Sequence, residues 1–190
     1  ISGSAGAVGG ISGDSLGGSF DFCYNKGILK GNGSIAGIST SANSINSCYN
    51  NGKIISESTN EVFISGIGVA TSGITNCYNT GEINVINDNT AWVSGITGTY
   101  QSCTIKNCYN TGKISMNSKE NETNEQRIAG IASIGSNIEN CYNLGEIEIT
   151  TNSTFVSIGG IEAVGHVGGL KKLCNSRKIQ VESEENIEKV

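Results

Sequence analysis

The chain has 190 residues, a formal net charge of −5, 27 glycines, seven cysteines and no proline. The acidic balance argues against nucleic-acid binding, which uses clustered basic residues, and no apolar stretch is long enough to predict membrane insertion. Because the chain does not begin with Met and shows no signal peptide, we expect a processed or excised part of a longer product.

Two short motifs alternate along the chain. The first is a hydrophobic-small-Gly-Ile segment, as in "ISGIG" at 64–68, and the second is Cys-Tyr-Asn-x-Gly-x-Ile, as in "NCYNTGEI" at 76–83. Successive copies of the second are about 25, 29, 31, 33 and 33 residues apart, a period typical of solenoids and propellers. The repeat predicts one domain over residues 1–190 without a linker. Its Cys recurs as Cys23, Cys48, Cys77, Cys108, Cys141 and, in the degraded form "CNSRKI", Cys174.

The repeated unit has the composition of β-strands. Short β-branched runs such as "EVFISGI" favour strands, and Gly and Asn recur too often for a helical solenoid. Stacked copies would place equivalent strands side by side at the ordinary strand spacing of about 4.8 Å. The sequence therefore predicts an all-β fold, a parallel β-solenoid (β-helix) of about six coils with roughly 30 residues per coil.

Side-chain parity predicts which residues face the interior. In the third copy, Cys77, Asn79 and Ile83 share one parity, whereas Tyr78 and Glu82 share the other. The charged residue must face water, so the isoleucine beside it lines the inside. The Gly that precedes them is a position where the strand can bend, so parity is a weaker guide on its other side, at the Cys and Asn positions. The inward aliphatic positions are predicted to be Ile28, Ile54, Ile83, Ile114, Ile147 and Ile179.

Two segments depart from the repeat. Residues 117–126, which are polar, lie where the repeat spacing lengthens, so we expect a surface loop or hairpin from Asn117 to Gln126. The stretch 182–190, "ESEENIEKV", offers the one plausible helical turn and is expected to be a C-terminal cap or a frayed polar tail.

The paired motifs resemble the GLUG motif of bacterial surface proteins, which include some immunoglobulin A peptidases and large adhesins. The matching stretches are "GGISG" at 9–13, "ISGIG" at 64–68 with "ITNCYNTGEI" at 74–83, and "RIAGIA" at 127–132 with "IENCYNLGEI" at 138–147. This resemblance implies a parallel β-helix in a secreted or wall-attached protein, often as a spacer or adhesive segment. The first copy lacks the Asn before Cys23, and the last copy lacks both Tyr and Gly, so the terminal coils are expected to be irregular or capped.

The cysteines have three interpretations. The favoured interpretation is that the cysteines are small buried apolar residues that fill a narrow interior. Neighbouring side chains in a parallel ladder point the same way, so they form disulfides poorly. A disulfide network is the second. A metal site is the third, although the chain has one His and no Cys-x-x-Cys pair. Cys103 lies off the ladder and would either bridge to Cys108 or sit in a longer turn.

The Asn and Tyr of the motif predict two further ladders. Stacked amides can hydrogen-bond to each other and to turn backbone, and this role is predicted for Asn25, Asn50, Asn79, Asn110 and Asn143. A column of tyrosines either packs against itself or presents rings that could stack on sugars. The candidate binding residues on this basis are Tyr49, Tyr78, Tyr109 and Tyr142.

Enzyme chemistry finds little support in the sequence. Carbohydrate-active enzymes need clustered carboxylates, but the three Asp residues, Asp14, Asp21 and Asp88, are widely separated. The lone His166 has no evident nucleophile partner. We expect no enzyme activity, no catalytic residue, no cofactor and no metal.

Three functions follow from these observations. The leading prediction is a non-catalytic structural module, a stalk, spacer or fibre-forming segment of a bacterial protein that is extracellular or attached to the cell wall. The alternative is an adhesin-type module for glycans or host proteins, and a carbohydrate-active enzyme comes third. The expected partners are flanking domains of a longer polypeptide, self-stacking copies, or a glycan or host surface.

Overall fold

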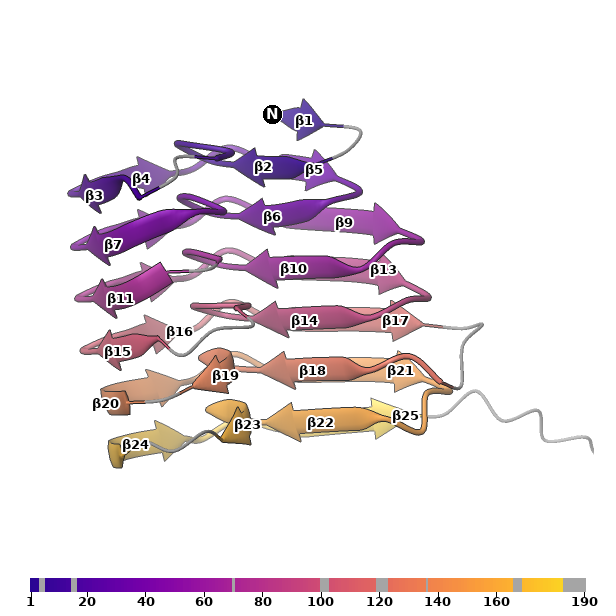
Figure 1. The fold of residues 1–190 in the computed structure, drawn as a ribbon. Coiled ribbons are helices and arrows are strands. Elements are labelled where there is room, and N and C mark those ends of the chain that lie inside the picture. Colours follow the sequence, from indigo (N-terminus) through magenta and orange to yellow (C-terminus); the bar gives the residue numbers. More distant parts are fainter. Residues whose placement is uncertain are drawn as a thin grey trace, which may run out of the picture.

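The chain folds into a stack of coils, with the N-terminus at one end of the stack (Figure 1). The computed structural model describes residues 1–3, 6–14, 17–69, 71–99, 103–118, 123–135, 137–165 and 169–182. Strands of successive coils pair in parallel in three sheets. Over the described residues we number six coils, which span 7–31, 34–58, 62–87, 91–118, 126–151 and 156–182. The predicted parallel β-solenoid is confirmed.

The strands are grouped by sheet. Within the described residues the first sheet has seven strands, β1 (Ser2–Gly3), β5 (Leu29–Gly31), β9 (Ile54–Ser58), β13 (Ile83–Asn87), β17 (Ile114–Ser118), β21 (Ile147–Thr151) and β25 (Ile179–Glu182). The second sheet comprises β2 (Ala7–Gly9), β6 (Ser34–Ala36), β10 (Val62–Ser65), β14 (Ala91–Ser94), β18 (Gln126–Ala129) and β22 (Val156–Gly159).

The third sheet bends, so most coils contribute two short strands to it. Its first half comprises β3 (Ser19–Asp21), β7 (Ala42–Asn46), β11 (Thr71–Thr75) and β15 (Thr104–Lys106), and its second half β4 (Tyr24–Asn25), β8 (Tyr49–Asn50), β12 (Tyr78–Asn79) and β16 (Tyr109–Asn110). In coils 5 and 6 a single longer strand spans both halves, β20 (Asn137–Asn143) and β24 (Leu170–Asn175). A small separate pair joins β19 (Ala132–Gly135) to β23 (Glu162–Gly165).

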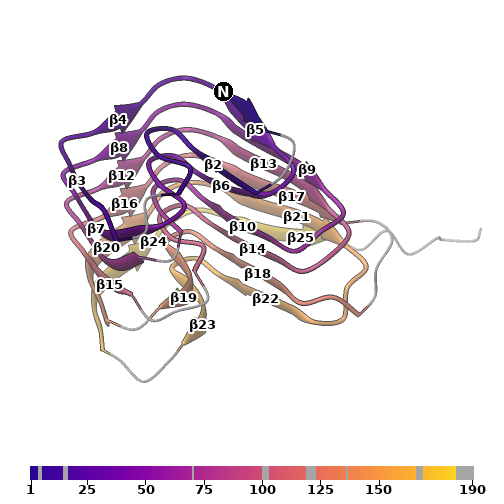
Figure 2. The same ribbon diagram turned by 45° about the horizontal axis from the view of Figure 1, so that its top comes forward.

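The interior consists of two apolar clusters. One fills the space between the first and second sheets, which run face to face in Figure 2, and combines residues such as Ile83 and Val93. The other lies within the bend of the third sheet and includes Ile74, Cys77 and Ile96. Each fully buried Ile contributes about 1.5–3 kcal/mol through loss of apolar surface from water.

The predicted alternation of inward and outward side chains is confirmed in coil 3. Cys77, Asn79 and Ile83 are buried, while Tyr78 and Glu82 are partly exposed. The aliphatic ladder runs through residues in parallel register, Leu29, Ile54, Ile83, Ile114, Ile147 and Ile179.

The prediction of Ile28 as an inward residue was wrong. Leu29 pairs with Ile54 and is fully buried, whereas Ile28 is 59% exposed. Leu29 stands four residues after Asn25, as Ile83 does after Asn79, so counting from the Asn assigns the register correctly. Ile179 keeps its place in the ladder but is 37% exposed, because it belongs to the last coil.

The prediction of Cys174 as a member of the cysteine ladder was also wrong. Leu173 pairs with Cys141 and occupies the inward position, whereas Cys174 pairs with Tyr142 and is exposed. The segment "LCNSRKI" therefore aligns with "CYNLGEI", and Asn175 continues the asparagine ladder. An apolar Leu takes the buried site because apolar burial is favourable, while the Cys falls on the tyrosine column.

The predicted insert is shorter than its sequence bounds. Asn117 and Ser118 end β17, and Gln126 begins β18, with Ser118 and Gln126 both buried. Residues 119–122 lie outside the described part of the chain. Of the expected cap at 182–190, Glu182 ends β25 and the remainder lies outside the described residues.

Candidate functional site

The tyrosines form a stacked column on the outer face of the solenoid. The ring centroids of Tyr49 and Tyr78, of Tyr78 and Tyr109, and of Tyr109 and Tyr142 are each 4.9 Å apart, with interplanar angles of 1–2°. Tyr24 joins the top of the column at 5.1 Å and 7° from Tyr49. The spacing equals that of the strands that carry the rings, so the backbone sets it.

This stacking decides which part of each ring a ligand can reach. Both faces of Tyr49, Tyr78 and Tyr109 lie against neighbouring rings, which leaves the outer ring edges and hydroxyl groups. Burial between its neighbours raises the pKa of the Tyr109 phenol. The end members are more open, with Tyr24 54% and Tyr142 38% exposed, and Lys26 Nζ lies 5.1 Å from the centroid of Tyr24. Sugar stacking on ring faces is therefore restricted to the two ends of the column.

The buried asparagines form a continuous chain of hydrogen bonds through the stack. Asn79 Nδ2 donates to Asn110 Oδ1 at 2.8 Å and to the Gly81 carbonyl at 2.9 Å. The same donor direction holds in every coil, from Asn25 to Asn50, Asn79, Asn110, Asn143 and Asn175, at 2.8 to 2.9 Å. These amides serve their neighbours rather than an outside ligand.

The glycine of the first motif packs against this asparagine ladder. A Cβ placed on Gly66 would lie 2.1 Å from the carbonyl oxygen of Gly95 and 2.5 Å from Cγ of Asn79. Gly95 has the same relation to Gly130 and Asn110. The two repeated motifs therefore recur together because the glycine of one leaves room for the asparagine of the other.

A second amide ladder, which the sequence analysis missed, lies on the outer surface beside the tyrosines. Asn107 Nδ2 donates to Asn76 Oδ1 at 3.0 Å, and Asn140 Nδ2 donates to Asn107 Oδ1 at 2.8 Å. These residues precede the motif Cys and have φ of 53–55°, the left-handed region that Asn tolerates well. The recurring Asn in "NCYN" was the available signal. In the other coils the equivalent position, one residue before the inward Cys or Leu, is occupied by Phe22, Ser47 and Lys172, also with φ of 52–55°.

The cysteines of coils 1 to 5 line the interior as thiols. Cys48 N donates to Cys77 Sγ at 3.4 Å, and Cys77 Sγ donates to the Thr75 carbonyl at 3.1 Å. Cys77 N repeats the first contact with Cys108 Sγ at 3.5 Å. All seven cysteines lie in the described residues and none forms a disulfide. Cys103 is buried in the same cluster, and its thiol donates to the Thr104 carbonyl instead of bridging to Cys108.

In each coil the third residue after the buried Asn faces outward, and in coils 2 to 6 these residues form a column whose charges alternate in sign. The column contains Lys53, Glu82, Lys113, Glu146 and Lys178. Lys53 pairs with Glu82 at 2.9 Å and lowers the pKa of that carboxyl, while Glu148 at 2.6 Å raises the pKa of Lys113. Such exposed pairs contribute roughly 0–1 kcal/mol each. Their alternation avoids the repulsion that identical repeats would create at the strand spacing.

An aromatic cluster on the second sheet was not foreseen from the sequence. Trp92 pairs in register with Phe63 and Arg127 on the neighbouring strands. The Phe63 and Trp92 rings meet edge to face at 5.1 Å, and Arg127 Cζ lies 4.4 Å from the Trp92 centroid. Glu125 accepts a hydrogen bond from Arg127 Nε at 2.9 Å. The spacing of Phe63 and Trp92 by one coil was the available signal.

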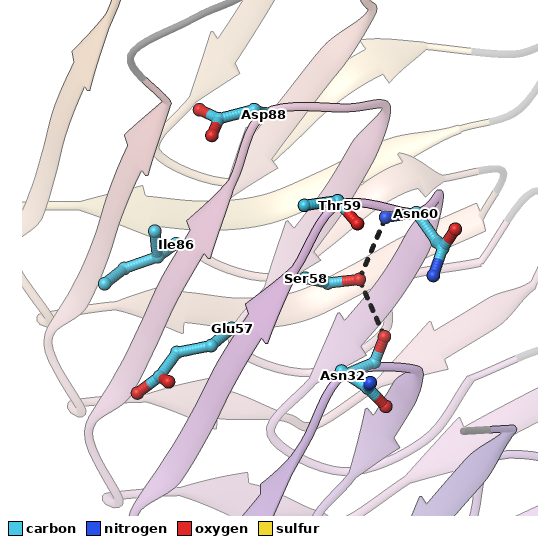
Figure 3. A pocket seen from close by; sticks show the side chains of 7 residues that line it. All are labelled: Asn32, Glu57, Ser58, Thr59, Asn60, Ile86 and Asp88. Carbon is cyan, nitrogen blue, oxygen red and sulfur yellow. Dashed lines mark hydrogen bonds between the residues drawn. The ribbon is translucent and has the colours of Figure 1, made fainter. Parts of the chain in front are cut away.

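A shallow hollow of about 390 Å³ lies where the first sheet turns into the second (Figure 3). Figure 3 shows the carboxylates of Glu57 and Asp88 at opposite ends of the hollow, with Ile86 between them. Ser58 Oγ donates to the Asn32 carbonyl at 2.7 Å, and Lys30 Nζ pairs with Glu57 at 3.0 Å. The hollow is lined by Asn32, Glu57, Ser58, Thr59, Asn60, Ile86 and Asp88.

A second hollow of about 250 Å³ lies on the outer face of coils 4 to 6. It is lined by Thr111, Lys113, Leu144, Glu146 and Arg177. Arg177 occupies the position that is Gly in the other coils. Among the described residues, no group of three or more His, Cys, Asp or Glu could hold a metal ion, and no helix could span a membrane. His166 lies outside the described residues.

Comparison of the chain with protein-family models found no match, and the comparisons with curated proteins and with solved structures found none either.

Proposed function

We propose that this chain is a non-catalytic structural module, a stalk, spacer or fibre-forming segment of a secreted or cell-surface bacterial protein. The observation that carries the proposal is the use of the repeated side chains. Asn79 is fully buried, and its Nδ2 donates hydrogen bonds to the Gly81 carbonyl and to Asn110 Oδ1 of the next coil. A motif devoted to contacts between coils builds length and stiffness rather than a reaction centre.

Two further observations support a rigid rod. Aliphatic, thiol and amide ladders run in register through successive coils, so no coil boundary lacks buried contacts. Ion pairs such as Lys106 with Glu139, at 3.3 Å, also join one coil to the next. Expected partners are flanking domains of a longer polypeptide or other copies of the chain.

The bacterial surface location rests on the resemblance to the GLUG motif. The residues that carry this resemblance, such as Gly66 and Asn79, are those that hold one coil to the next. The proposed localisation is extracellular or attached to the cell wall.

Pulling the chain from its two ends in an optical trap tests the spacer function. A rod built from successive coils should lengthen in steps of about 100 Å, the extended length of roughly 30 residues, as coils detach one at a time. Smooth extension without such steps at low force would contradict a rigid spacer.

A second candidate function is glycan or host-protein binding along the tyrosine column. The partial exposure of Tyr24 and Tyr142 favours it, because one ring at each end offers a more open surface. Binding to an array of glycans that is lost in Tyr142→Ala but kept in Asn51→Ala, an exposed control, would favour this function over the spacer. The double variant Tyr78→Ala with Tyr109→Ala tests whether ring edges take part.

A further inference from the structure

Five thiols stand one above the other in the interior, one in each of coils 1 to 5. The tyrosines that directly follow them pair in parallel register from coil to coil. Each Sγ also makes the same local contact, because it donates to the carbonyl two residues earlier at 3.1 to 3.4 Å. The side chains therefore share one orientation. This cysteine ladder consists of Cys23, Cys48, Cys77, Cys108 and Cys141.

The spacing of the ladder matches the span of one metal ion held between two sulfurs. Equivalent atoms of neighbouring coils repeat at the strand spacing of about 4.8 Å. The tyrosine rings beside the ladder show the same repeat, with centroids 4.9 Å apart. A bond between a thiolate and a metal is about 2.3 Å long, so two such bonds in line span about 4.6 Å. An ion between neighbouring sulfurs would therefore need almost no movement of the backbone.

We propose that neighbouring thiols of the cysteine ladder bind soft ions of the copper(I) type, each held in line between the sulfurs of two successive coils. Thiolate sulfur is the protein ligand that selects copper(I). Two ligands suffice for such an ion, so these sites differ from the groups of three or more ligands that the described residues lack. Zinc takes four ligands in a tetrahedron and does not fit a ladder that offers two sulfurs at each gap.

Backbone N–H groups point at the sulfurs of the ladder. Cys48 N donates to Cys77 Sγ at 3.4 Å, and Cys108 N donates to Cys141 Sγ at 3.4 Å. Cys48 Sγ accepts from Cys23 N at 3.3 Å, and Cys108 Sγ accepts from Cys77 N at 3.5 Å. Such bonds stabilise the ionised form of sulfur, which is the form that binds a metal. The favoured pairs are therefore Cys48 with Cys77 and Cys108 with Cys141.

Binding exchanges protons for the ion. Two thiols and one copper(I) ion give a copper bis-thiolate with one negative charge and release two protons, and no oxidation state changes. The S–H bonds to the carbonyls two residues earlier are lost. The N–H bonds to sulfur remain and become stronger, because the acceptor is now charged.

The geometry limits the ladder to two ions. A sulfur with an ion on both sides would need its two metal bonds in opposite directions along the ladder, whereas the bonds of a thiolate sulfur that also carries Cβ are bent. Each sulfur therefore takes one ion, and the two favoured pairs use four of the five thiols. One ion would join coil 2 to coil 3, and the other would join coil 4 to coil 5.

Refolding the full chain from urea with copper(I), in the absence of oxygen, tests the proposal. The ion is supplied during refolding because the favoured pairs are buried in the folded chain. A background of Cys103→Ser with Cys174→Ser removes the two thiols outside the ladder. Native mass spectrometry after desalting should show two copper ions per chain. The loaded chain should also melt at a higher temperature than the copper-free chain, and zinc(II) should not be retained.

Two double variants in this background retain the same number of ladder thiols but differ in which are neighbours. Cys48→Ser with Cys108→Ser leaves three thiols and no neighbouring pair, so it should retain no copper. Cys48→Ser with Cys77→Ser also leaves three thiols, but Cys108 and Cys141 remain neighbours, so it should retain one ion. The Ser hydroxyl can accept the same N–H bond and donate to the same carbonyl as the thiol.

Circular dichroism and melting without copper show whether each variant folds. If a Ser variant does not fold, the same pair of positions changed to Ala repeats the comparison. Three results would overturn the inference: no copper on the background chain, equal copper on the two double variants, or equal retention of zinc(II). None of them bears on the spacer function, which the pulling experiment tests on the copper-free chain.

Discussion

Asn110 accepts a hydrogen bond from Asn79 Nδ2 at 2.8 Å and donates through its own Nδ2 to Asn143 at the same distance. It is fully buried, and its second donor bond goes to the Gly112 carbonyl at 2.9 Å. A single amide thus joins three coils, so a substitution in the ladder removes contacts on both sides of a coil.

Asn110→Ala should lower the free energy of unfolding by about 2–4 kcal/mol. The substitution leaves Asn79 Nδ2 and Asn143 Oδ1 buried with one partner fewer, and each such loss costs about 1–3 kcal/mol. Urea denaturation followed by circular dichroism measures the change. Asn51→Ala, at an exposed position, should shift stability by no more than about 0.5 kcal/mol, and equal effects in the two variants would argue against the buried ladder.

Gly95→Ala should destabilise the chain by about 2–3 kcal/mol. The added Cβ would lie 2.2 Å from the Gly130 carbonyl oxygen and 2.4 Å from Cγ of Asn110, so the second sheet and the ladder would have to separate. The matched control is Gly73→Ala in β11, where the nearest atom is the Thr104 carbonyl oxygen at 3.8 Å. There the substitution should be neutral or stabilise by about 0.4–1 kcal/mol. Thermal melting of the two variants should therefore show shifts in different directions or of very different size.

Ser47→Asn should stabilise the chain by roughly 0.5–1 kcal/mol. Ser47 has φ of 52°, and Asn adopts this left-handed conformation more readily than most residues with a Cβ. Ser47→Val should instead cost about 1–2 kcal/mol, because a β-branched side chain disfavours the same backbone region. A higher denaturation midpoint for the Val variant than for the Asn variant would disprove the claim that the left-handed backbone at position 47 favours Asn.

Cys174→Tyr should raise stability by about 0.5–1.5 kcal/mol by adding a ring below Tyr142. The prediction tests the register of the last coil. If Cys174 instead lay in the buried cysteine column, a tyrosine there would overpack the interior and lower the melting temperature. Leu173→Tyr, which places the ring at the inward position, should be destabilising and serves as the comparison.

Alkylation at pH 8 should modify Cys174 rapidly and Cys23 more slowly, because Cys174 is exposed and Cys23 is partly exposed. Burial raises the pKa of the Cys108 thiol well above its ordinary value of 9.0, so this group stays protonated at pH 8. Mass spectrometry after brief iodoacetamide treatment measures the pattern. Rapid modification of the buried thiols in the folded chain would contradict the structure. The buried cysteines are Cys48, Cys77, Cys103, Cys108 and Cys141.

The raised pKa of Cys108 also predicts a pH dependence of stability. In the unfolded chain the thiol ionises near pH 9, whereas in the folded chain it ionises at a higher pH. The stabilisation from keeping it neutral is therefore complete below about pH 9 and is lost as the pH rises above that value. Urea denaturation at pH 7 and pH 10 should show a smaller loss of stability in Cys108→Ala than in the wild type. An equal loss in both chains would indicate that other groups cause the alkaline effect.

The regular coils were predictable because their information is local. Alternation along a strand decides that Asn79 faces inward and Tyr78 outward, and a period near 30 residues predicts that equivalent residues meet. The first and last coils were less predictable. Aligning the copies by their isoleucines placed Ile28 inside, where Leu29 lies, and aligning them by their cysteines placed Cys174 inside, where Leu173 lies. Neither alignment used the Asn, which stays in register in every coil.

By itself the sequence determined the fold class, the coil length and the inward face of the regular strands, because periodicity and parity are properties of the chain. Only the tertiary structure decided what those positions contact. It closed the faces of the central tyrosines by stacking them 4.9 Å apart, paired glycine with asparagine across the coil, and brought Phe63, Trp92 and Arg127 together on one sheet. These contacts depend on how the sheets bend and pair across coils, which no single copy of the repeat specifies.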